Sequence, residues 1–381
     1  MNILHLTHTD IRSDSRILKE MGCLAREYPA ANILGLGIML EEEVHKTEES
    51  LPFDVVSFKL MSRKWFLLPK AIRHIFILIE LVMRMLLRAL KHKPRVIHCH
   101  DTVVLPLGWL LKKLTKAKLI YDAHELESDK NGQTPLMSKG TLWIEKFVWP
   151  CVDALIVVSP SIAGWYERHL GVVKTEVVMN SPYIDTQFRE VNAFYLRDKF
   201  NIPLEAKIYI YIGILGYGRG IELILEVFKK TTTQSHVVFL GYGELAARIK
   251  QDGLDYHNIH YHEAVPHSQV VGIARSADFG FCLVQNVSLS DYYCLPNKLF
   301  EYAFAGLPVL ASNFPDISAL VQEYDLGKCI ELSMTSIGET LDSLQFQEKK
   351  MINTLSLYPL SWQAQEEKII NLYHQLSKEN R

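Results

Sequence analysis

A lysine and a glutamate one helical turn apart mark the part of this sequence best suited to chemistry. Within residues 295–312, Pro296 suits the start of a helix and Gly306 its end. The N-terminus of a helix presents free N–H groups and partial positive charge, which suit a phosphate. Lys298 adds a full charge there, and Glu301 can accept hydrogen bonds from sugar hydroxyls. The segment therefore predicts a site that holds a nucleotide diphosphate by its phosphates and its ribose.

The same segment resembles the donor-site signature of family 4 glycosyltransferases, which have the two-domain GT-B fold. In that family an E-x7-E motif opens the helix, and its second Glu contacts the donor ribose. Glu301 stands at the second position but Tyr293 at the first, as in a branch that reads P-N-K-L-F-E-Y and then A-G-x-P-V. The resemblance implies a donor-binding set of Asn297, Lys298, Leu299 and Glu301. The alternative is a plain βαβ helix packed on a sheet.

A glycine-rich turn, Gly216-Tyr-Gly-Arg-Gly220, follows the strand candidate 208–212. Glycines let the backbone approach a phosphate closely, and Arg219 can hold it with two hydrogen bonds. Family members usually carry an Arg after this strand and a Lys before the helix; Arg219 takes the Lys position, and Ile214 stands where the Arg is expected. We expect Gly216, Gly218 and Arg219 to bind the donor, with Arg219 and Lys298 stabilising the departing diphosphate.

A second turn, Leu240-Gly-Tyr-Gly-Glu244, resembles the G-x-G-E turn that lies near the nucleotide base in this family. Gly241 and Gly243 are therefore further donor-binding candidates. An ordinary tight turn between a strand and a helix explains the same glycines.

The segment Tyr121-Asp-Ala-His-Glu-Leu126 places a histidine just after a strand. Histidine is the side chain best suited to exchanging hydrogen bonds and protons near neutral pH. In the GT-B family a histidine here reaches the donor sugar and phosphate, which implies a catalytic role for His124 and an acceptor-side position for Glu125. A histidine that only holds its loop is the alternative.

Two histidines in His98-Cys-His-Asp101 raise the question of a metal, because alternate residues of a strand share one face. A tetrahedral site would need a further partner that the sequence does not name, and no Asp-x-Asp motif is present. We therefore predict no metal site. The family has H-x-H-D here too, so Asp101 is expected to cap a helix or to face the acceptor.

The first predicted loop, His8-Thr-Asp-Ile-Arg-Ser-Asp-Ser-Arg16, is followed by Ile17-Leu-Lys-Glu20, and together they resemble the D-x-R-x-x-K-E pattern of the same branch. Asp14 is expected to cap the following helix, and Arg16 to face the cleft and an acceptor. A solvated helix start is the alternative.

Short apolar segments alternate with helical patterns along the chain, which indicates an α/β protein with two facing Rossmann-like domains and mainly parallel sheets. The domains are expected at 1–182 (acceptor), 183–360 (donor) and 361–381, a C-terminal helix that crosses back to the first domain. Expected strands are 3–8, 32–37, 55–58, 96–99, 118–121, 154–158, 176–179, 208–212, 236–240, 259–261, 279–283 and 307–311. Expected helices include 15–27, 67–90, 104–114, 139–149, 161–169, 191–200 and 361–377.

Composition excludes several classes of protein. The 381 residues suit two domains, and 48% hydrophobic with 22% charged residues suits a globular chain. A net charge of −2 gives no case for nucleic acid as a partner. The six cysteines form no C-x-x-C pair and the N-terminus runs into a strand pattern, so we expect a reduced, cytoplasmic setting without a secretory signal.

Residues 61–95 carry nine basic residues against one acid, Glu80, around an apolar run. Glu80, Arg84 and Arg88 lie at four-residue spacing, so the run is not a membrane span. One interpretation is a helix lying peripherally on an anionic membrane face. The other is a domain helix packed on a sheet.

Together these features predict a glycosyltransferase that moves a sugar from a nucleotide diphosphate sugar, UDP-linked, to a lipid-linked or saccharide acceptor in cell-surface polysaccharide or glycolipid assembly. The resemblance implies retention of configuration with no metal or other cofactor. Two alternatives stay open: a nucleotide-sugar epimerase of the GT-B fold, and a non-catalytic scaffold of a polysaccharide assembly complex.

Overall fold

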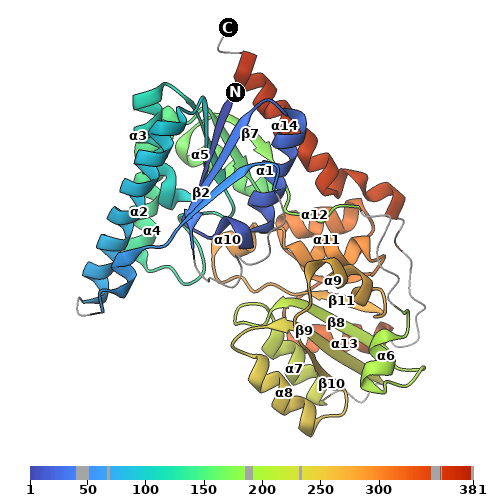
Figure 1. The fold of residues 1–381 in the computed structure, drawn as a ribbon. Helices are drawn as coiled ribbons and strands as arrows, with labels where there is room; N and C mark the ends of the chain where they lie inside the picture. The colour runs from blue at the N-terminus through green and yellow to red at the C-terminus, as the bar shows by residue number, and fades with distance from the viewer. Residues whose placement is uncertain are drawn as a thin grey trace. The chain divides into compact units, whose positions relative to one another are not determined.

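The structure is a computed structural model that describes residues 1–39, 51–66, 69–184, 192–230, 234–344, 352 and 354–378. The chain divides into two compact units, which we call unit 1 (Met1–Val178 with Glu366–Arg381) and unit 2 (Met179–Gln365). Each unit contains one parallel sheet with its helices packed against it (Figure 1). The predicted fold class, α/β with two Rossmann-like domains, is confirmed.

The sheet of unit 1 has seven strands in the order β3-β2-β1-β4-β5-β6-β7. The strand order reverses between β1 and β4, and in open α/β sheets ligands bind at the carboxyl ends of the strands beside such a point. The strands are β1 (Asn2–Leu6), β2 (Asn32–Ile38), β3 (Asp54–Phe58), β4 (Val96–His100), β5 (Lys118–Ala123), β6 (Ala154–Val157) and β7 (Lys174–Val177).

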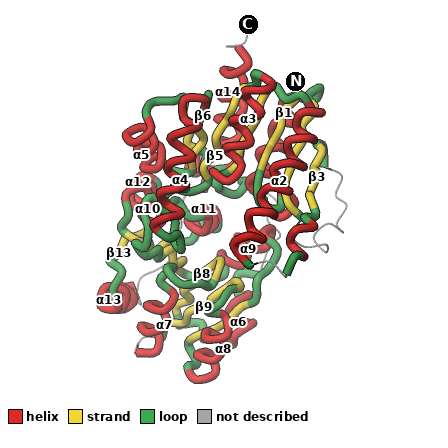
Figure 2. The backbone as a smooth tube through the Cα atoms, turned by 90° about the vertical axis from the view of Figure 1, so that its left-hand side faces the viewer, coloured by secondary structure: helices red, strands yellow, loops and turns green. Residues whose placement is uncertain are grey.

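Helices cover both faces of this sheet. Figure 2 shows α5, α4, α3 and α2 in front of the strands, and Figure 1 shows α1 and α14 on the opposite side. The bounds are α1 (Ser15–Glu27), α2 (Lys70–His92), α3 (Leu105–Thr115), α4 (Pro135–Val148), α5 (Pro160–Leu170), and the 3-10 helices η1 (Ile11–Ser13), η3 (Met61–Lys64), η4 (Thr102–Val104) and η5 (Trp149–Cys151). Side-chain caps begin several of these helices, as when Ser159 accepts from the Ile162 N–H.

The last helix, α14 (Trp362–Lys378), begins in unit 2 and packs on unit 1. Its Tyr373 hydroxyl lies 2.9 Å from Nδ1 of His98 on β4, and Glu366 pairs with Arg26 of α1 at 2.5 Å. The predicted return of the C-terminal helix to the first domain is therefore confirmed.

Unit 2 has a six-stranded sheet in the order β10-β9-β8-β11-β12-β13, which reverses between β8 and β11. Its strands are β8 (Lys207–Ile214), β9 (Ser235–Tyr242), β10 (Ile259–His262), β11 (Phe279–Cys282), β12 (Val309–Ser312) and β13 (Gly327–Ile330). Its helices are α6 (Tyr195–Phe200), α7 (Ile221–Lys230), α8 (Ala246–Asp255), α9 (His267–Ala274), α10 (Leu289–Tyr292), α11 (Asn297–Phe304), α12 (Pro315–Glu323), α13 (Met334–Leu344) and the 3-10 helix η6 (Thr354–Leu360).

Alternation along β8 explains how this sheet is covered on both faces. Ile208, Ile210 and Ile212 join one hydrophobic cluster, whereas Tyr209 and Tyr211 join another. Successive side chains of a strand point to opposite faces, so a strand that is apolar at every position must be buried on both.

A few boundaries differ from the sequence prediction. The helix expected at 139–149 begins earlier, at Pro135, because the Thr134 hydroxyl accepts from the Met137 N–H and caps it. The strand expected at 176–179 lies at Lys174–Val177, and β13 and α10 were not predicted. Leu67 of the predicted helix 67–90 and Val191 of the predicted helix 191–200 lie outside the described residues; those helices begin at Lys70 and Tyr195.

Candidate functional site

The helix predicted to bind the donor, α11, is held in place by Tyr302. Its hydroxyl accepts a hydrogen bond from the Ile212 N–H at 2.9 Å and lies 3.1 Å from the Ile210 carbonyl oxygen of β8. A Cβ on Gly280 of β11 would approach the Tyr302 ring to 2.6 Å, so only glycine fits beneath it. The N-terminus of α11 is thus fixed beside the carboxyl end of β8.

Lys298 lies on the first turn of α11 and Glu301 one turn further in, as predicted, but both are almost buried. Lys298 is 7% exposed, and its Nζ lies 3.5 Å from the centre of the Tyr211 ring, which provides a cation–π contact. Glu301 is 6% exposed, with one oxygen 3.3 Å from Nε2 of His267. Asn297, at the first position, is exposed.

Leu299 does not suit the donor contact predicted for it. Its side chain is fully buried in the core, and its N–H donates to the Pro296 carbonyl oxygen at 3.0 Å. The N–H is therefore satisfied within the first turn of the helix.

Arg219 lies in the glycine-rich turn between β8 and α7 and is partly buried. Gly218 and Gly220 on either side have φ angles of 79° and 72°, which glycine adopts without strain. Burial raises the pKa of the Cys294 thiol, while the charges of Lys298 and Arg219 act in the opposite direction.

Gly241 and Gly243 are required by the backbone itself. A Cβ at Gly241 would lie 1.9 Å from the Gly213 carbonyl oxygen, and one at Gly243 would lie 2.4 Å from that of Leu215. The two turns at the ends of β8 and β9 pack directly on each other. The alternative interpretation, a tight turn, therefore explains both glycines. A Cβ on Gly216 would make only ordinary contacts, 3.7 Å from Glu244 and 3.8 Å from Ile214.

Unit 1 brings polar residues together at the carboxyl ends of β1, β4 and β5. His8 follows β1, Asp101 follows β4 and His124 follows β5, and each end lies at or near the reversal of strand order. Nδ1 of His124 and Nδ1 of His8 each lie 3.8 Å from a carboxylate oxygen of Asp101. Glu125, predicted beside the acceptor, is exposed.

His124 carries a positive charge at neutral pH. Its side chain is 19% exposed, and its Nε2 lies 3.2 Å from Oδ2 of Asp122. Burial opposes protonation, but the carboxylates of Asp101 and Asp122 outweigh it and raise the pKa of His124 to about 10. The residue can donate hydrogen bonds to an anionic ligand in this state, but it cannot act as a base.

The guanidinium of Arg16 is bound by groups within unit 1. The predicted position of Arg16 facing the cleft and an acceptor is therefore wrong. Its guanidinium donates to Asp122 at 3.0 Å and to the Val178 carbonyl oxygen at 2.8 Å, and it lies 3.0 Å from Glu20. The side chain is buried, so it is neither a cleft residue nor a solvated one. Asp14 does cap α1, because its carboxylate accepts from the Arg16 and Ile17 N–H groups.

Asp101 does not cap the following helix, contrary to one of its predicted roles. It precedes η4 with φ 67° and ψ 164°, and its side chain makes no capping hydrogen bond. The carboxylate faces His8 and His124 instead, because the left-handed backbone turns it away from the helix N–H groups.

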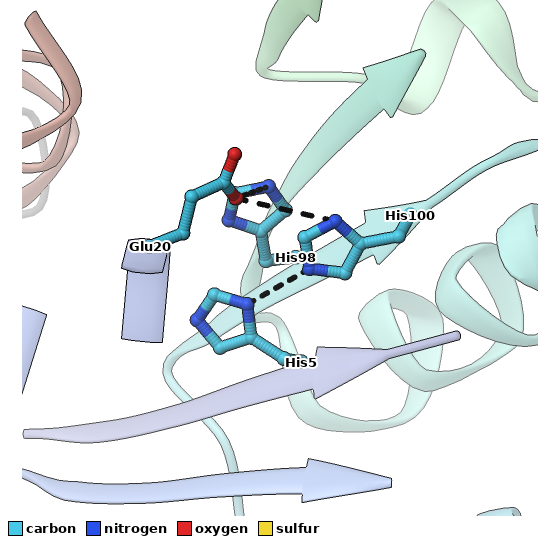
Figure 3. A group of neighbouring side chains, drawn as sticks. All are labelled: His5, Glu20, His98 and His100. Carbon is cyan, nitrogen blue, oxygen red and sulfur yellow. Dashed lines mark hydrogen bonds and ion pairs between the residues drawn. The ribbon is translucent and has the colours of Figure 1, made fainter. Parts of the chain in front are cut away.

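A buried cluster of three histidines and a glutamate is drawn in Figure 3, and its His100 lies 3.2 Å from Nε2 of His124. His5 of β1 and His98 and His100 of β4 have nearly parallel rings, and Glu20 of α1 lies 3.6 Å from His98. Burial is the largest cause that lowers the pKa of each histidine, so all three are neutral. Together with His98 and His100, His5 and Glu20 form a group that could hold a metal ion. The sequence analysis could not identify these two further ligands.

Sequence reasoning missed Asp122 and Glu20, although simple spacing points to both. Asp122 stands two residues before His124 on β5 and therefore points to the same side. Glu20 stands four residues after Arg16 on α1, where side chains meet.

An apolar surface covers part of the helical layer of unit 1. α2 packs through Leu81, Met85 and Ala89 but leaves its other apolar side chains exposed, and α4 does the same. We define this apolar surface by Met61, Trp65, Phe66, Ile72, Ile75, Phe76, Leu78, Ile79, Met83, Leu87, Leu90, Leu136, Met137, Trp143 and Phe147. Among the described residues, none of the helices has the length and apolar character needed to cross a bilayer.

Comparison with known proteins agrees with both halves of the chain. Residues 25–182 match the family described as glycosyl transferase 4-like domain, and residues 194–351 match glycosyl transferases group 1. A D-inositol 3-phosphate glycosyltransferase of Corynebacterium diphtheriae is 22% identical over 257 residues, which are 62% of this chain and 58% of that protein. The match thus spans less than two thirds of that relative.

Solved structures share the fold over the whole chain. Sucrose-phosphate synthase from Thermosynechococcus elongatus superimposes with a TM-score of 0.79 at 14% identity, covering 100% of both chains. HepE from Anabaena, solved in complex with UDP-glucose, gives 0.73 at 12% identity and covers 98% of this chain and 100% of its own. On the two family matches and this shared fold, the chain belongs to the glycosyltransferases with the GT-B fold.

Proposed function

We propose that this enzyme transfers a sugar from a UDP-linked donor to a lipid-linked or saccharide acceptor, with retention of configuration and without a metal. The observation that carries the proposal is the position of Lys298 and Glu301 one turn apart on α11, with Lys298 beside the end of β8, where a Cβ on Gly213 would lie 4.0 Å from its Cε. The HepE complexes with UDP and with UDP-glucose support the choice of donor class.

The donor's diphosphate would be held by cations that have no competing anion. Within the part of the chain that the structure describes, neither Lys298 nor Arg219 has a carboxylate within salt-bridge distance. Negative charge builds up on the diphosphate as the glycosidic bond breaks, and fixed cations stabilise that charge. Glu301 would accept hydrogen bonds from the ribose hydroxyls.

His124 would contribute from unit 1 as a hydrogen-bond donor. Because its pKa is raised to about 10, it carries two N–H groups at neutral pH and suits the sugar or phosphate oxygens of the donor. A phosphate oxygen of the donor would take the acceptor's proton, since His124 is already protonated.

The apolar surface of unit 1 fits an acceptor carried in a lipid bilayer. Apolar side chains on α2 and α4 are accompanied by basic residues such as Arg73, Arg88 and Lys91, a pattern typical of helices that lie in a membrane interface. We therefore propose a peripheral position on an anionic membrane face and a role in polysaccharide or glycolipid assembly.

A panel of UDP- and GDP-sugars tests the donor. A ligand that binds only the folded state stabilises it by RT ln(1 + [L]/Kd), about 2.7 kcal/mol at 100 times Kd. We expect UDP-sugars to raise the melting temperature and GDP-sugars to do so less. Stabilisation by none of them would contradict the donor site, and conversion of the bound donor to its epimer without an acceptor would indicate the epimerase alternative.

A further inference from the structure

Three ligand atoms in unit 1 lie at nearly equal distances from one another. Nδ1 of His100 lies 3.3 Å from Oδ2 of Asp122, Nε2 of His124 lies 3.2 Å from the same oxygen, and the two nitrogens are 3.2 Å apart. His100 and Asp122 are paired residues of the neighbouring strands β4 and β5, and His124 follows β5 directly. The sheet register therefore forms this triangle.

Without an ion, hydrogen bonds hold these three atoms together. Nδ1 of His100 and Nε2 of His124 can each donate to Oδ2 of Asp122, and Nε2 of His98 lies 3.4 Å from the same oxygen. A cation bound by the same three atoms would take the place of the protons on the two histidine nitrogens.

The spacing is that of a tetrahedral transition-metal site. Zinc–nitrogen and zinc–oxygen bonds of about 2.0–2.1 Å place neighbouring ligands about 3.3–3.4 Å apart. The rings of His100 and His124 meet at 62°, so their planes converge. The rings of His5, His98 and His100 in Figure 3 are within 16–27° of parallel, so their nitrogens converge less well on one point, although they and Glu20 also lie close enough to hold an ion.

Each atom of the triangle also has a partner behind it. Nδ1 of His124 faces Asp101 at 3.8 Å, and the far nitrogen of His100 lies 3.0 Å from Nδ1 of His5. The other oxygen of Asp122 accepts from Arg16 at 3.0 Å. Metal-binding histidines usually donate their second N–H to such a partner, which fixes the ring. His124, being partly exposed, provides the access route.

We propose that His100, Asp122 and His124 form a site for a divalent transition-metal ion of the Zn²⁺ type. Two imidazoles and one carboxylate favour Zn²⁺, Co²⁺ or Ni²⁺ over Mg²⁺ or Ca²⁺. The ion takes the place of the proton on Nε2 of His124, which faces Asp122 at 3.2 Å, and leaves the N–H group on Nδ1 in place. Binding should therefore release protons and weaken as the pH falls. The proposed transfer reaction does not use the ion.

Calorimetric titration of the metal-free full-length protein with Zn²⁺ tests the site without any substrate. We expect one ion per chain, and with Co²⁺ the intense visible absorption of a tetrahedral complex. His124→Ala should weaken Zn²⁺ binding by at least about 100-fold, and Asp101→Asn by about 10- to 100-fold through loss of the outer partner. His260→Ala is the matched control, because His260 stacks on His236 in unit 2 in a similar histidine pair and should leave Zn²⁺ affinity unchanged.

The outcomes decide whether the site exists. Equal Zn²⁺ affinity in the wild type, His124→Ala and Asp101→Asn would overturn it. Should His124→Ala fail to fold, the Co²⁺ spectrum of the wild type and the Asp101→Asn affinity decide. Failure of the donor site appears separately, as a loss of UDP binding in metal-free protein.

Discussion

The charged residues of the two units are arranged in opposite ways. In unit 1, Arg16 is buried against Asp122 and Glu20, and these two carboxylates neutralise its charge. In unit 2, Lys298 is equally buried, but it lies on the ring of Tyr211 and has no carboxylate partner among the described residues. A buried cation without an anion is costly, and binding an anionic ligand relieves that cost. The ion pairs of Arg16 thus stabilise the folded structure of unit 1, whereas the unpaired charge of Lys298 suits the binding of a diphosphate.

The largest effect is expected from Asp122→Asn. Removing one partner of a buried ion pair costs about 3–5 kcal/mol, because Arg16 would keep its charge without full compensation. Urea denaturation of both proteins measures the loss. Asp14→Ala is the control. It removes the N-terminal cap of α1, the helix that carries Arg16, and should lower the free energy of unfolding by about 1 kcal/mol. A loss for Asp122→Asn no larger than that of the control would contradict a structural network.

Lys298→Ala and Arg219→Ala should show the reverse behaviour, with affinity lost and stability largely kept. Each removes a charge-assisted contact worth about 1.5–3 kcal/mol, so UDP binding should weaken by about one to two decades. Calorimetry provides the affinity, with Lys328→Ala on the exposed part of β13 as the control. If neither variant weakens UDP binding, the nucleotide lies elsewhere.

The apolar surface of unit 1 should bind anionic vesicles in a salt-dependent way. Replacing Ile79 and Leu87 together with serine removes two exposed apolar side chains, and partitioning should fall by at least about 10-fold. Leu254→Ser is the control, because Leu254 is also an exposed leucine but lies in unit 2. Absence of flotation at low salt would exclude the membrane contact and favour a saccharide acceptor free in solution.

The smallest effect concerns Glu80, whose carboxylate holds η3 to α2. Burial opposes its ionisation, but hydrogen bonds from Ser62 and Met61 and the charge of Arg84 lower its pKa to about 2. The folded pKa lies below the ordinary 4.5, so this stabilisation is present above about pH 4.5 and disappears as the pH falls towards 2. The difference in unfolding free energy between wild type and Glu80→Gln should shrink over that range. A difference that does not change with pH would contradict the assignment.

The fold could be predicted from sequence because its signals are local. The apolar strands of both sheets and the caps at Asp14 and Pro296 each act over a few residues, and most element boundaries followed from them. β13 escaped prediction because Gly327 and Lys328 give an edge strand with little apolar character. Its pairing with β12 is a tertiary effect that spacing does not reveal.

The candidate site could be predicted only in part. Motifs pointed to Lys298, Glu301 and His124, but not to the burial of Lys298 and Glu301 or to the carboxylates beside His124. The partners of Arg16 come from α1, β5 and the end of unit 1's sheet, up to 162 residues away in sequence, so its inward orientation was not visible. Likewise, the sequence left a donor contact and a tight turn both open for Gly241 and Gly243, and the close approach of the neighbouring turn, which explains them, is visible only in the structure.

The central claim is that unit 2 binds the nucleotide while His124 of unit 1 serves the reaction. Turnover of the UDP-sugar that stabilises the protein, measured for His124→Ala alongside UDP affinity and melting temperature, tests it most directly. We expect turnover to fall by roughly 100-fold or more, with UDP affinity and stability nearly unchanged. Glu301→Ala should mainly weaken donor binding. A stable His124→Ala enzyme with full activity would contradict the account.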